Sequence, residues 1–194
     1  MTTANIFVVS DTHFGHNNMY KFVEADGFPV RRRADNSAMN TEEGDELMIE
    51  NWNKTVRDQD IIYHCGDVYF GQGHVCLHRL RGRKRLLLGN HDDGKDERLH
   101  NAFQKVLLWR MLPELGVLLS HTPQHTSNMF KTKYNFHGHI HRKGNVSPVH
   151  LNVSVEVQDY TPKSIEDLLV QVKRNEQSWE TRNKPAGKLA GFPI

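Results

Sequence analysis

Nearly every short apolar segment of this chain ends in Asp, Asn or His, most often beside a glycine. The first segment, residues 6–10, is a β-branched run typical of a buried strand, and Asp11 follows it directly. Four later segments end at Gly66-Asp67, Gly89-Asn90, Ser120-His121 and Gly138-His139. In open α/β sheets, ligand sites gather at the carboxyl ends of strands. Five such strand ends therefore predict one shared site on an α/β fold.

The segments between these strand ends predict helices mixed with further strands. Helices are expected at 16–23, from Asn40 onward, at 74–80 and after Ser164, and 27–38 is expected to be an exposed loop. Asn40 and Glu43 form a capping-box-like start, and Met48, Ile49, Trp52 and Val56 recur on one face. Strands are expected at 61–63, 85–88, 106–111, 117–119, 134–136 and 149–157. This order predicts a single α/β domain.

The length of 194 residues suits one compact domain. We predict a catalytic domain over 1–176 and an irregular tail over 177–194. No signal peptide is expected, and charged residues and a proline interrupt the most apolar region, 106–119, so no membrane span is predicted. The two cysteines lack metal or redox spacing and fit a cytoplasmic protein. A net charge of +2 does not by itself predict nucleic-acid binding.

Asp11 and His13 are two positions apart, so on an extended backbone their side chains share a face. A carboxylate beside an imidazole suits a divalent ion of borderline hardness, although such pairs are common by chance. Gly66-Asp67 adds a second carboxylate, and its glycine allows close backbone approach. An ordinary turn is the alternative there.

The remaining motifs supply amide and imidazole groups. In Gly89-Asn90-His91-Asp92, the Asn offers a carbonyl oxygen to a metal and His91 points elsewhere, which suits a general acid; a plain β-turn is equally open. Gly138-His139-Ile140-His141 places two imidazoles on one face, and ligands are the favoured interpretation. His121 taken alone would be interpreted as a buried, hydrogen-bonded histidine.

In this order, the five motifs resemble those of the calcineurin-like metallophosphoesterase superfamily. The segments 10–16 and 52–67, which ends in Tyr63-His64-Cys65-Gly66-Asp67, are similar to a small single-domain branch found in bacteria and bacteriophages, and 134–141 and 152–160 match it as well. The likeness covers about residues 5–170 with all five motifs intact. It implies a sandwich of two mixed sheets flanked by helices, in a four-layer αββα order, with the site at the strand ends.

The resemblance also implies the roles of single residues. Asp11, His13 and His141 would hold one metal ion, Asn90, His121 and His139 would hold another, and Asp67 would bridge the two. His91 would protonate the leaving group, and Asp92 would orient His91 or hold its charged form. Manganese is the expected ion, with Fe, Zn, Ni, Co and Mg as alternatives. General two-metal chemistry would then supply a hydroxide, shared by the ions, for in-line attack on phosphorus.

Other residues carry weaker predictions. His16 would contact the substrate phosphate from a helix N-terminus, or it is a cap or surface histidine. The run Arg31, Arg32 and Arg33, with Arg32 as the main candidate, would clamp phosphate, although loop arginines are usually solvated. The basic segment 79–85 would follow a nucleic-acid backbone, but a solvated helix end is favoured.

These observations predict a hydrolase of phosphodiester or phosphomonoester bonds in small molecules such as nucleotides or cyclic nucleotides. A nuclease acting on DNA or RNA is the alternative, with short nucleic acid as partner, but the chain lacks an added capping domain and a concentrated basic face. A non-catalytic metal-binding scaffold is a third hypothesis, which the suitable residue types at all seven ligand positions and at His91 disfavour. No membrane partner is expected.

Overall fold

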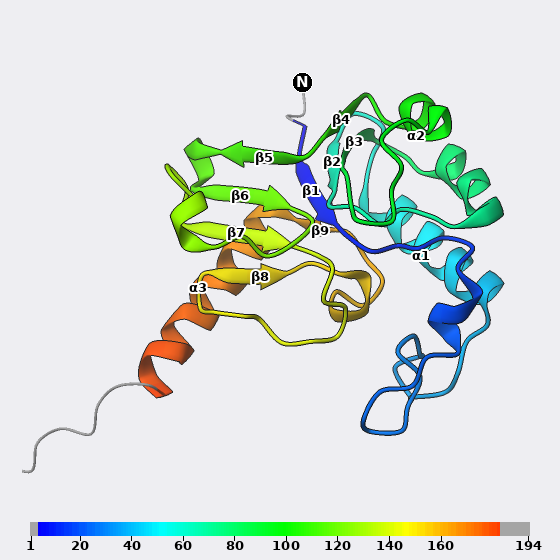
Figure 1. Cartoon of the computed structure of the whole chain (residues 1–194), viewed down its shortest axis with the longest axis horizontal. Coiled ribbons are helices and arrows are strands. Elements are labelled where there is room, and N and C mark those ends of the chain that lie inside the picture. Colours follow the sequence, from blue (N-terminus) through cyan, green and yellow to red (C-terminus); the bar gives the residue numbers. More distant parts are fainter. Residues whose placement is uncertain (1–3, 183–194) are drawn as a thin grey trace, which may run out of the picture.

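The computed structural model describes residues 4–182, which form two mixed β-sheets flanked by helices (Figure 1). The first sheet has the strand order β4-β3-β2-β1-β9. In it, β1 (Ile6–Val9), β2 (Ile61–His64), β3 (Arg83–Leu87) and β4 (Lys105–Leu107) are parallel, and β9 (Lys163–Ser164) is antiparallel to β1. The second sheet has the order β5-β6-β7-β8. There, β6 (Val117–Ser120), β7 (Tyr134–His137) and β8 (His150–Asn152) are parallel, and β5 (Trp109–Leu112) is antiparallel to β6. The predicted fold class is confirmed.

Alternate residues of the first sheet belong to two separate cores. Phe7 and Val9 pack in one hydrophobic cluster with residues of α1, whereas Val8 packs in a second cluster with Leu119 and Phe136 of the second sheet. This division follows from the period of two along a strand, which sends successive side chains to opposite faces. The second cluster therefore lies between the sheets and fixes one against the other.

Helix α1 (Thr41–Thr55) begins as its sequence predicts. Asn40 Oδ1 accepts the amide of Glu43 at 2.9 Å, and the Glu43 carboxylate accepts the amide of Asn40 at 3.0 Å. The face carrying Met48, Ile49 and Trp52 is buried in the first cluster. The capping box and the apolar face are both confirmed.

Helix α3 (Ile165–Arg182) follows Ser164, whose hydroxyl accepts the amide of Asp167 at 3.1 Å, so the predicted cap is confirmed. Three of its side chains, Ile165, Leu168 and Val172, pack in the cluster between the sheets. The helix continues through 177–182, where we expected irregular chain. The rest of the predicted tail, 183–194, lies outside the described residues.

Several predicted elements differ in the structure. The single strand expected at 106–111 is two strands, because the chain leaves the edge of the first sheet as β4 and enters the edge of the second as β5. The strand expected at 149–157 ends with β8 and continues as the 3₁₀ helix η5 (Val155–Val157). The helices expected at 16–23 and 74–80 are the 3₁₀ helices η1 (Asn17–Tyr20) and η2 (Gly71–Arg79). Helix α2 (Glu97–Ala102), β9 and the short 3₁₀ helices η3 (Pro113–Leu115) and η4 (Thr126–Asn128) were not predicted.

The arrangement of the strands determines where the site lies. Strands β1, β2 and β3 run in parallel, as do β6 and β7, so within each sheet their carboxyl ends meet at one edge. A parallel bridge between Ser10 and Ser154 joins the two sheets at that edge. Within 4–182, no helix is both long enough and apolar enough to cross a membrane.

Candidate metal centre

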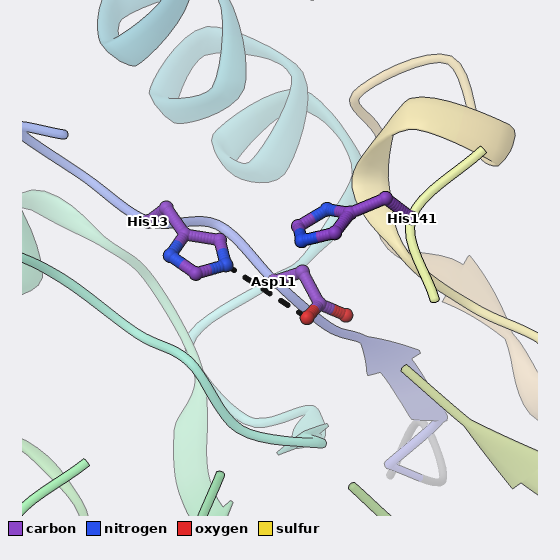
Figure 2. Close-up of side chains that lie close together, drawn as sticks. All are labelled: Asp11, His13 and His141. Carbon is purple, nitrogen blue, oxygen red and sulfur yellow. Dashed lines mark ion pairs between the residues drawn. The ribbon is translucent and has the colours of Figure 1, made fainter. Parts of the chain in front are cut away.

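Asp11, His13 and His141 form a first cluster of possible metal ligands (Figure 2). Asp11 and His13 follow β1, and His141 follows β7. One ligand atom from each residue lies within 4.8 Å of the others, and His13 Nε2 is 3.9 Å from Asp11 Oδ1. The structure therefore brings together the three residues that the resemblance assigned to one ion.

The backbone at five of the expected ligands is left-handed, whereas we predicted an extended backbone at Asp11 and His13 and at His139 and His141. The φ angles are +59° at Asp11, +44° at His13, +58° at Asp67, +72° at His139 and +48° at His141. For residues other than glycine this conformation costs roughly 1–2 kcal/mol each, and it persists where the surrounding structure imposes it, most often at functional sites. Five of the seven expected ligands share this strained geometry.

Arg31 holds the first strained loop in place. Its side chain is completely buried and donates to the main-chain carbonyls of Asp11 at 2.6 Å and Thr12 at 2.8 Å. It also pairs with Glu156 at 2.9 Å. Arg31 is therefore not placed to act as the phosphate clamp considered for the arginine run; it holds the backbone at the candidate ligand Asp11 instead.

Glu156, the partner of Arg31, also contacts His141. Glu156 Oε2 lies 3.3 Å from His141 Nδ1, which leaves the other ring nitrogen of His141 free to bind a metal. Burial raises the pKa of Glu156, but the positive charge of Arg31 and the hydrogen bond with His141 together outweigh burial and lower this pKa to about 2. The carboxylate therefore stays ionised and can hold a proton on the Nδ1 side of His141.

Asn90, His121 and His139 form the second cluster. Asn90 Oδ1 lies 2.8 Å from His121 Nε2 and 2.9 Å from His139 Nδ1. His121 Nδ1 donates to the carbonyl of Cys65 at 2.8 Å, so in the neutral ring Nε2 carries a lone pair. That lone pair faces the amide oxygen of Asn90, and a cation between the two would remove their repulsion.

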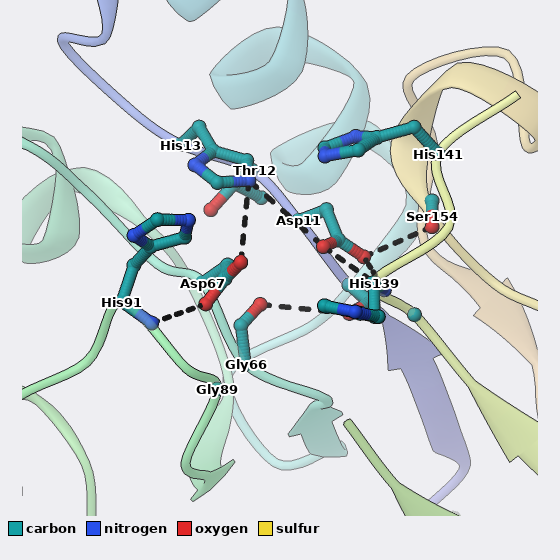
Figure 3. A network of polar contacts seen from close by, with 12 residues as sticks. Asp11, Thr12, His13, Gly66, Asp67, Gly89, His91, His139, His141 and Ser154 are labelled. Atoms are coloured by element: carbon teal, nitrogen blue, oxygen red, sulfur yellow. Dashed lines mark hydrogen bonds and ion pairs between the residues drawn. The ribbon is translucent and has the colours of Figure 1, made fainter. Parts of the chain in front are cut away.

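Asp67 contacts both clusters, and Figure 3 shows its carboxylate below His13 and beside His91. Its Oδ2 is 3.6 Å from His13 Nε2 of the first cluster and 3.5 Å from His121 Nε2 of the second. Its Oδ1 accepts the amide of His91 at 2.9 Å, which fixes the direction of the carboxylate. One oxygen atom is therefore available to both clusters.

The residues present fit a pair of divalent ions. Within residues 4–182, neither ring nitrogen of His13 has a hydrogen-bond partner, although only 3% of the residue is exposed. Burial, reinforced by the charge of Arg31, lowers the pKa of His13, so its ring stays neutral and keeps a lone pair for a metal. Imidazole nitrogens together with carboxylate and amide oxygens are the ligand set of Mn, Fe, Zn and similar ions.

Two glycines allow the loops to approach so closely. A Cβ atom at Gly138 would overlap the side chains of Ser10 and Asp11, and one at Gly89 would overlap Asp67. A larger residue at either position would push a ligand loop away from its neighbour. We predicted close backbone approach at Gly66, beside Asp67. Gly89, beside Asn90, and Gly138, beside His139, allow a similar close approach.

Asp11→Asn should stabilise the metal-free protein near neutral pH. Burial is the main cause that raises the pKa of Asp11 from 3.8 to about 6. The pKa of Asp11 is higher in the folded than in the unfolded protein, so ionisation of Asp11 destabilises the fold. This loss of stability is absent below pH 3.8, grows as the pH rises and is complete above about pH 6. The variant should gain up to about 3 kcal/mol at pH 7 and little at pH 4. Urea unfolding in EDTA measures this, and an equal gain at both pH values would contradict it.

His91 lies beside the first cluster and is exposed. Its ring centroid is 5.8 Å from that of His13 and 5.2 Å from that of Phe70. We expected Asp92 to orient His91, but its carboxylate accepts the amides of Asp67, Val68 and Gly89 at 2.8–2.9 Å. Asp92 therefore ties two ligand loops together and does not serve as a partner of the His91 ring.

A cavity of about 490 Å³ is lined by His13 and His141 of the first cluster, by His139 of the second and by His91. His16 lines it, as its candidate role requires, but η1 is a single 3₁₀ turn and not the helix N-terminus that we invoked. Arg32 lines a different cavity and pairs with Asp26 at 3.1 Å, so it is not placed as a phosphate ligand. Arg142 and Lys143 line the cavity and were not predicted. Their only sequence signal is their place directly after His141.

The basic segment 79–85 lies away from this cavity. Its residues surround the start of β3, whereas the candidate ligand Asn90 follows the end of that strand. Arg79 pairs with Glu46, the amide of Arg81 donates to Asn53, and Lys84 donates to the carbonyl of Leu80. The favoured interpretation as a solvated helix end agrees with these local contacts.

The chain is similar to proteins from archaea, bacteria and bacteriophages. It is 29% identical over 187 residues to an uncharacterized protein of Methanocaldococcus jannaschii, covering 89% of this chain and 93% of that protein. It is 28% identical over 174 residues to the gene 66 protein of Mycobacterium phage L5, covering 71% of this chain and 78% of that protein. No model of a protein family matches the chain.

A solved structure shares the fold. The crystal structure of a protein of unknown function from Aquifex aeolicus aligns with a TM-score of 0.67 at 26% identity, covering 86% of this chain and 98% of that one. An archaeal phosphodiesterase aligns with a TM-score of 0.42 at 15% identity, covering 83% of this chain and 98% of that one, a likeness too distant to bear on activity. The Aquifex aeolicus structure supports the fold.

Proposed function

We propose that this chain is a binuclear metal-dependent phosphoesterase of the calcineurin-like type. The observation that carries the proposal is the position of Asp67 Oδ2, 3.6 Å from a histidine of one cluster and 3.5 Å from a histidine of the other. A shared carboxylate oxygen between two sets of nitrogen and oxygen ligands is what a pair of ions needs, whereas a single ion would need one set only.

The side chains of the site suit phosphate-ester hydrolysis. When bound, a pair of divalent ions would activate water and neutralise charge on the phosphate oxygens. His91 lies at the edge of the clusters, where it can give a proton to the departing alcohol oxygen. Arg142 and Lys143 add positive charge on the cavity wall for the nonbridging oxygens. Phe70, stacked against His13 with ring centroids 5.5 Å apart, holds that ligand and limits its access to water.

Manganese is the ion that we propose, because ligation by imidazole and carboxylate groups together suits it and its neighbours in the first transition row. The proposed substrates are phosphodiesters or phosphomonoesters of small molecules, with nucleotides or cyclic nucleotides foremost. We also propose a cytoplasmic site of action, which the two buried free thiols Cys65 and Cys76 suit.

Hydrolysis of bis(4-nitrophenyl) phosphate tests this proposal. Purified protein treated with EDTA and then supplied with Mn²⁺ should release 4-nitrophenol, and protein kept in EDTA should not. The activity should saturate with the second equivalent of Mn²⁺ per chain, because both clusters are needed. Equal rates with and without metal, or saturation at one equivalent, would contradict the proposal.

A further inference from the structure

A small hairpin beside the cavity exposes apolar side chains. The segment 22–30 follows η1 and folds back on itself, with the amide of Val30 donating to the carbonyl of Phe22 at 2.9 Å and the amide of Glu24 donating to that of Phe28 at 2.9 Å. It lies in the blue part of the chain that projects at the lower right of Figure 1. Phe22, Val23 and Phe28 are 50%, 61% and 42% exposed. Such exposed apolar side chains on one short hairpin indicate a contact surface.

Of these three side chains, only Phe22 lines the cavity over the metal centre. It ends a row of aromatic rings that begins at His91 and continues through Phe70 and His16. Successive ring centroids along this row are 5.2, 4.1 and 6.4 Å apart. The row, which we call the aromatic wall, leads from the proposed proton donor to the exposed hairpin.

Polar groups accompany the aromatic wall. Arg142 and Lys143 line the same cavity, and Glu24 on the hairpin adds a carboxylate to it. Arg142 Nε donates to the carbonyl of Val30 at 2.6 Å, which ties the hairpin to the loop that carries His141. The cavity therefore combines a stacking surface, positive charge and a hydrogen-bond acceptor.

We propose that the aromatic wall is a nucleoside subsite, in which Phe22 stacks on the base of a nucleotide ester whose phosphate lies at the metal centre. This assignment rests on the proposed phosphoesterase function and identifies the residues that would bind the nucleoside of its substrates. A flat ring gains about 1–3 kcal/mol by stacking on an aromatic side chain, whichever base it is. Glu24 would accept hydrogen bonds from a sugar hydroxyl or an exocyclic amine, and Arg142 would contact a phosphate oxygen.

The experiment compares three phosphodiesters that all release 4-nitrophenolate. They differ only in the group retained on phosphorus, which is thymidine, methyl or decyl. Phe22→Ala should lower the ratio of kcat/KM for the thymidine ester to that for the methyl ester by about 5- to 150-fold, the equivalent of the stacking energy. Phe22→Trp, which keeps an aromatic ring, should give a ratio close to that of the wild type. Phe28→Ala is the matched control, because Phe28 is on the same hairpin but packs under Arg32, outside the cavity, and should leave the ratio unchanged.

A second measurement separates the subsite from the proposed reaction. Thymidine 5′-phosphate, titrated calorimetrically in the presence of Mn²⁺, should bind more weakly to Phe22→Ala by the same factor. If the wild type hydrolyses no ester yet binds this nucleotide through Phe22, the proposed function fails and the subsite stands. The nucleoside subsite is wrong if Phe22→Ala leaves the ratio of kcat/KM unchanged, as Phe28→Ala should. It is also wrong if Phe22→Ala lowers kcat/KM for the decyl ester as much as for the thymidine ester.

Discussion

His91→Ala is expected to lower kcat by about 10²–10⁴-fold for substrates with an alkoxide leaving group. An alkoxide is strongly basic and needs a proton as it departs, and the His91 ring lies beside the first cluster and lines the cavity without a predicted role as a ligand. The loss should shrink for 4-nitrophenolate, which leaves without help from an acid. Steady-state kinetics with an alkyl ester and a nitrophenyl ester of the same phosphate measure both effects.

Metal content separates this proton-donor role from a ligand role. His91→Ala should retain as much Mn²⁺ as the wild type, because the contact of His91 with Asp67 is made by its backbone amide. His78→Ala, a change at an exposed histidine on η2, is the matched control and should alter neither the Mn²⁺ content nor kcat. Equal losses for both leaving groups, or loss of metal with the His91 ring, would contradict the assignment of the acid.

Asp67→Asn is expected to weaken both metal sites together. One carboxylate oxygen faces a histidine of each cluster, and the amide that replaces it carries no charge and can point an NH₂ group at one of them. Loss of a bridging ligand should exceed the roughly 10–100-fold in affinity that loss of an outer-shell partner costs, and turnover should fall with it. Titration of Mn²⁺ into metal-free protein measures both sites.

The control for this variant is Asp58→Asn, which changes an exposed carboxylate outside the site. Loss of a single ion from Asp67→Asn, with the second site at wild-type affinity, would show that Asp67 belongs to one site only. The bridging role would then be wrong even if the protein remained a metal-dependent hydrolase.

The position of the site was predictable because it depends on local patterns. An apolar run followed by Asp, Asn or His indicates a strand end, and parallel strands bring their carboxyl ends to one edge. Asp11, Asp67 and Asn90 follow three neighbouring parallel strands, so their convergence needs no further information. Helix α1 was predictable for the same reason, since its capping box and apolar face are both local.

What could not be predicted depends on contacts between distant segments. Arg31, Arg32 and Arg33 are alike in sequence, yet one is buried against Glu156, one pairs with Asp26 and one with Glu43. The partner of Arg31 is 125 residues away, so no local pattern marks it. The left-handed backbone at Asp11 and His13 accompanies contacts with another distant segment, because their amides donate to the carbonyls of Gly66 and Asp67, and the expected extended geometry was wrong.

The most direct test of the two-ion centre is an anomalous difference map from crystals grown with Mn²⁺, recorded at the manganese absorption edge. Two peaks are expected, one among Asp11, His13 and His141, the other among Asn90, His121 and His139, with Asp67 between them. A single peak, or two peaks that do not share Asp67, would contradict the proposed centre.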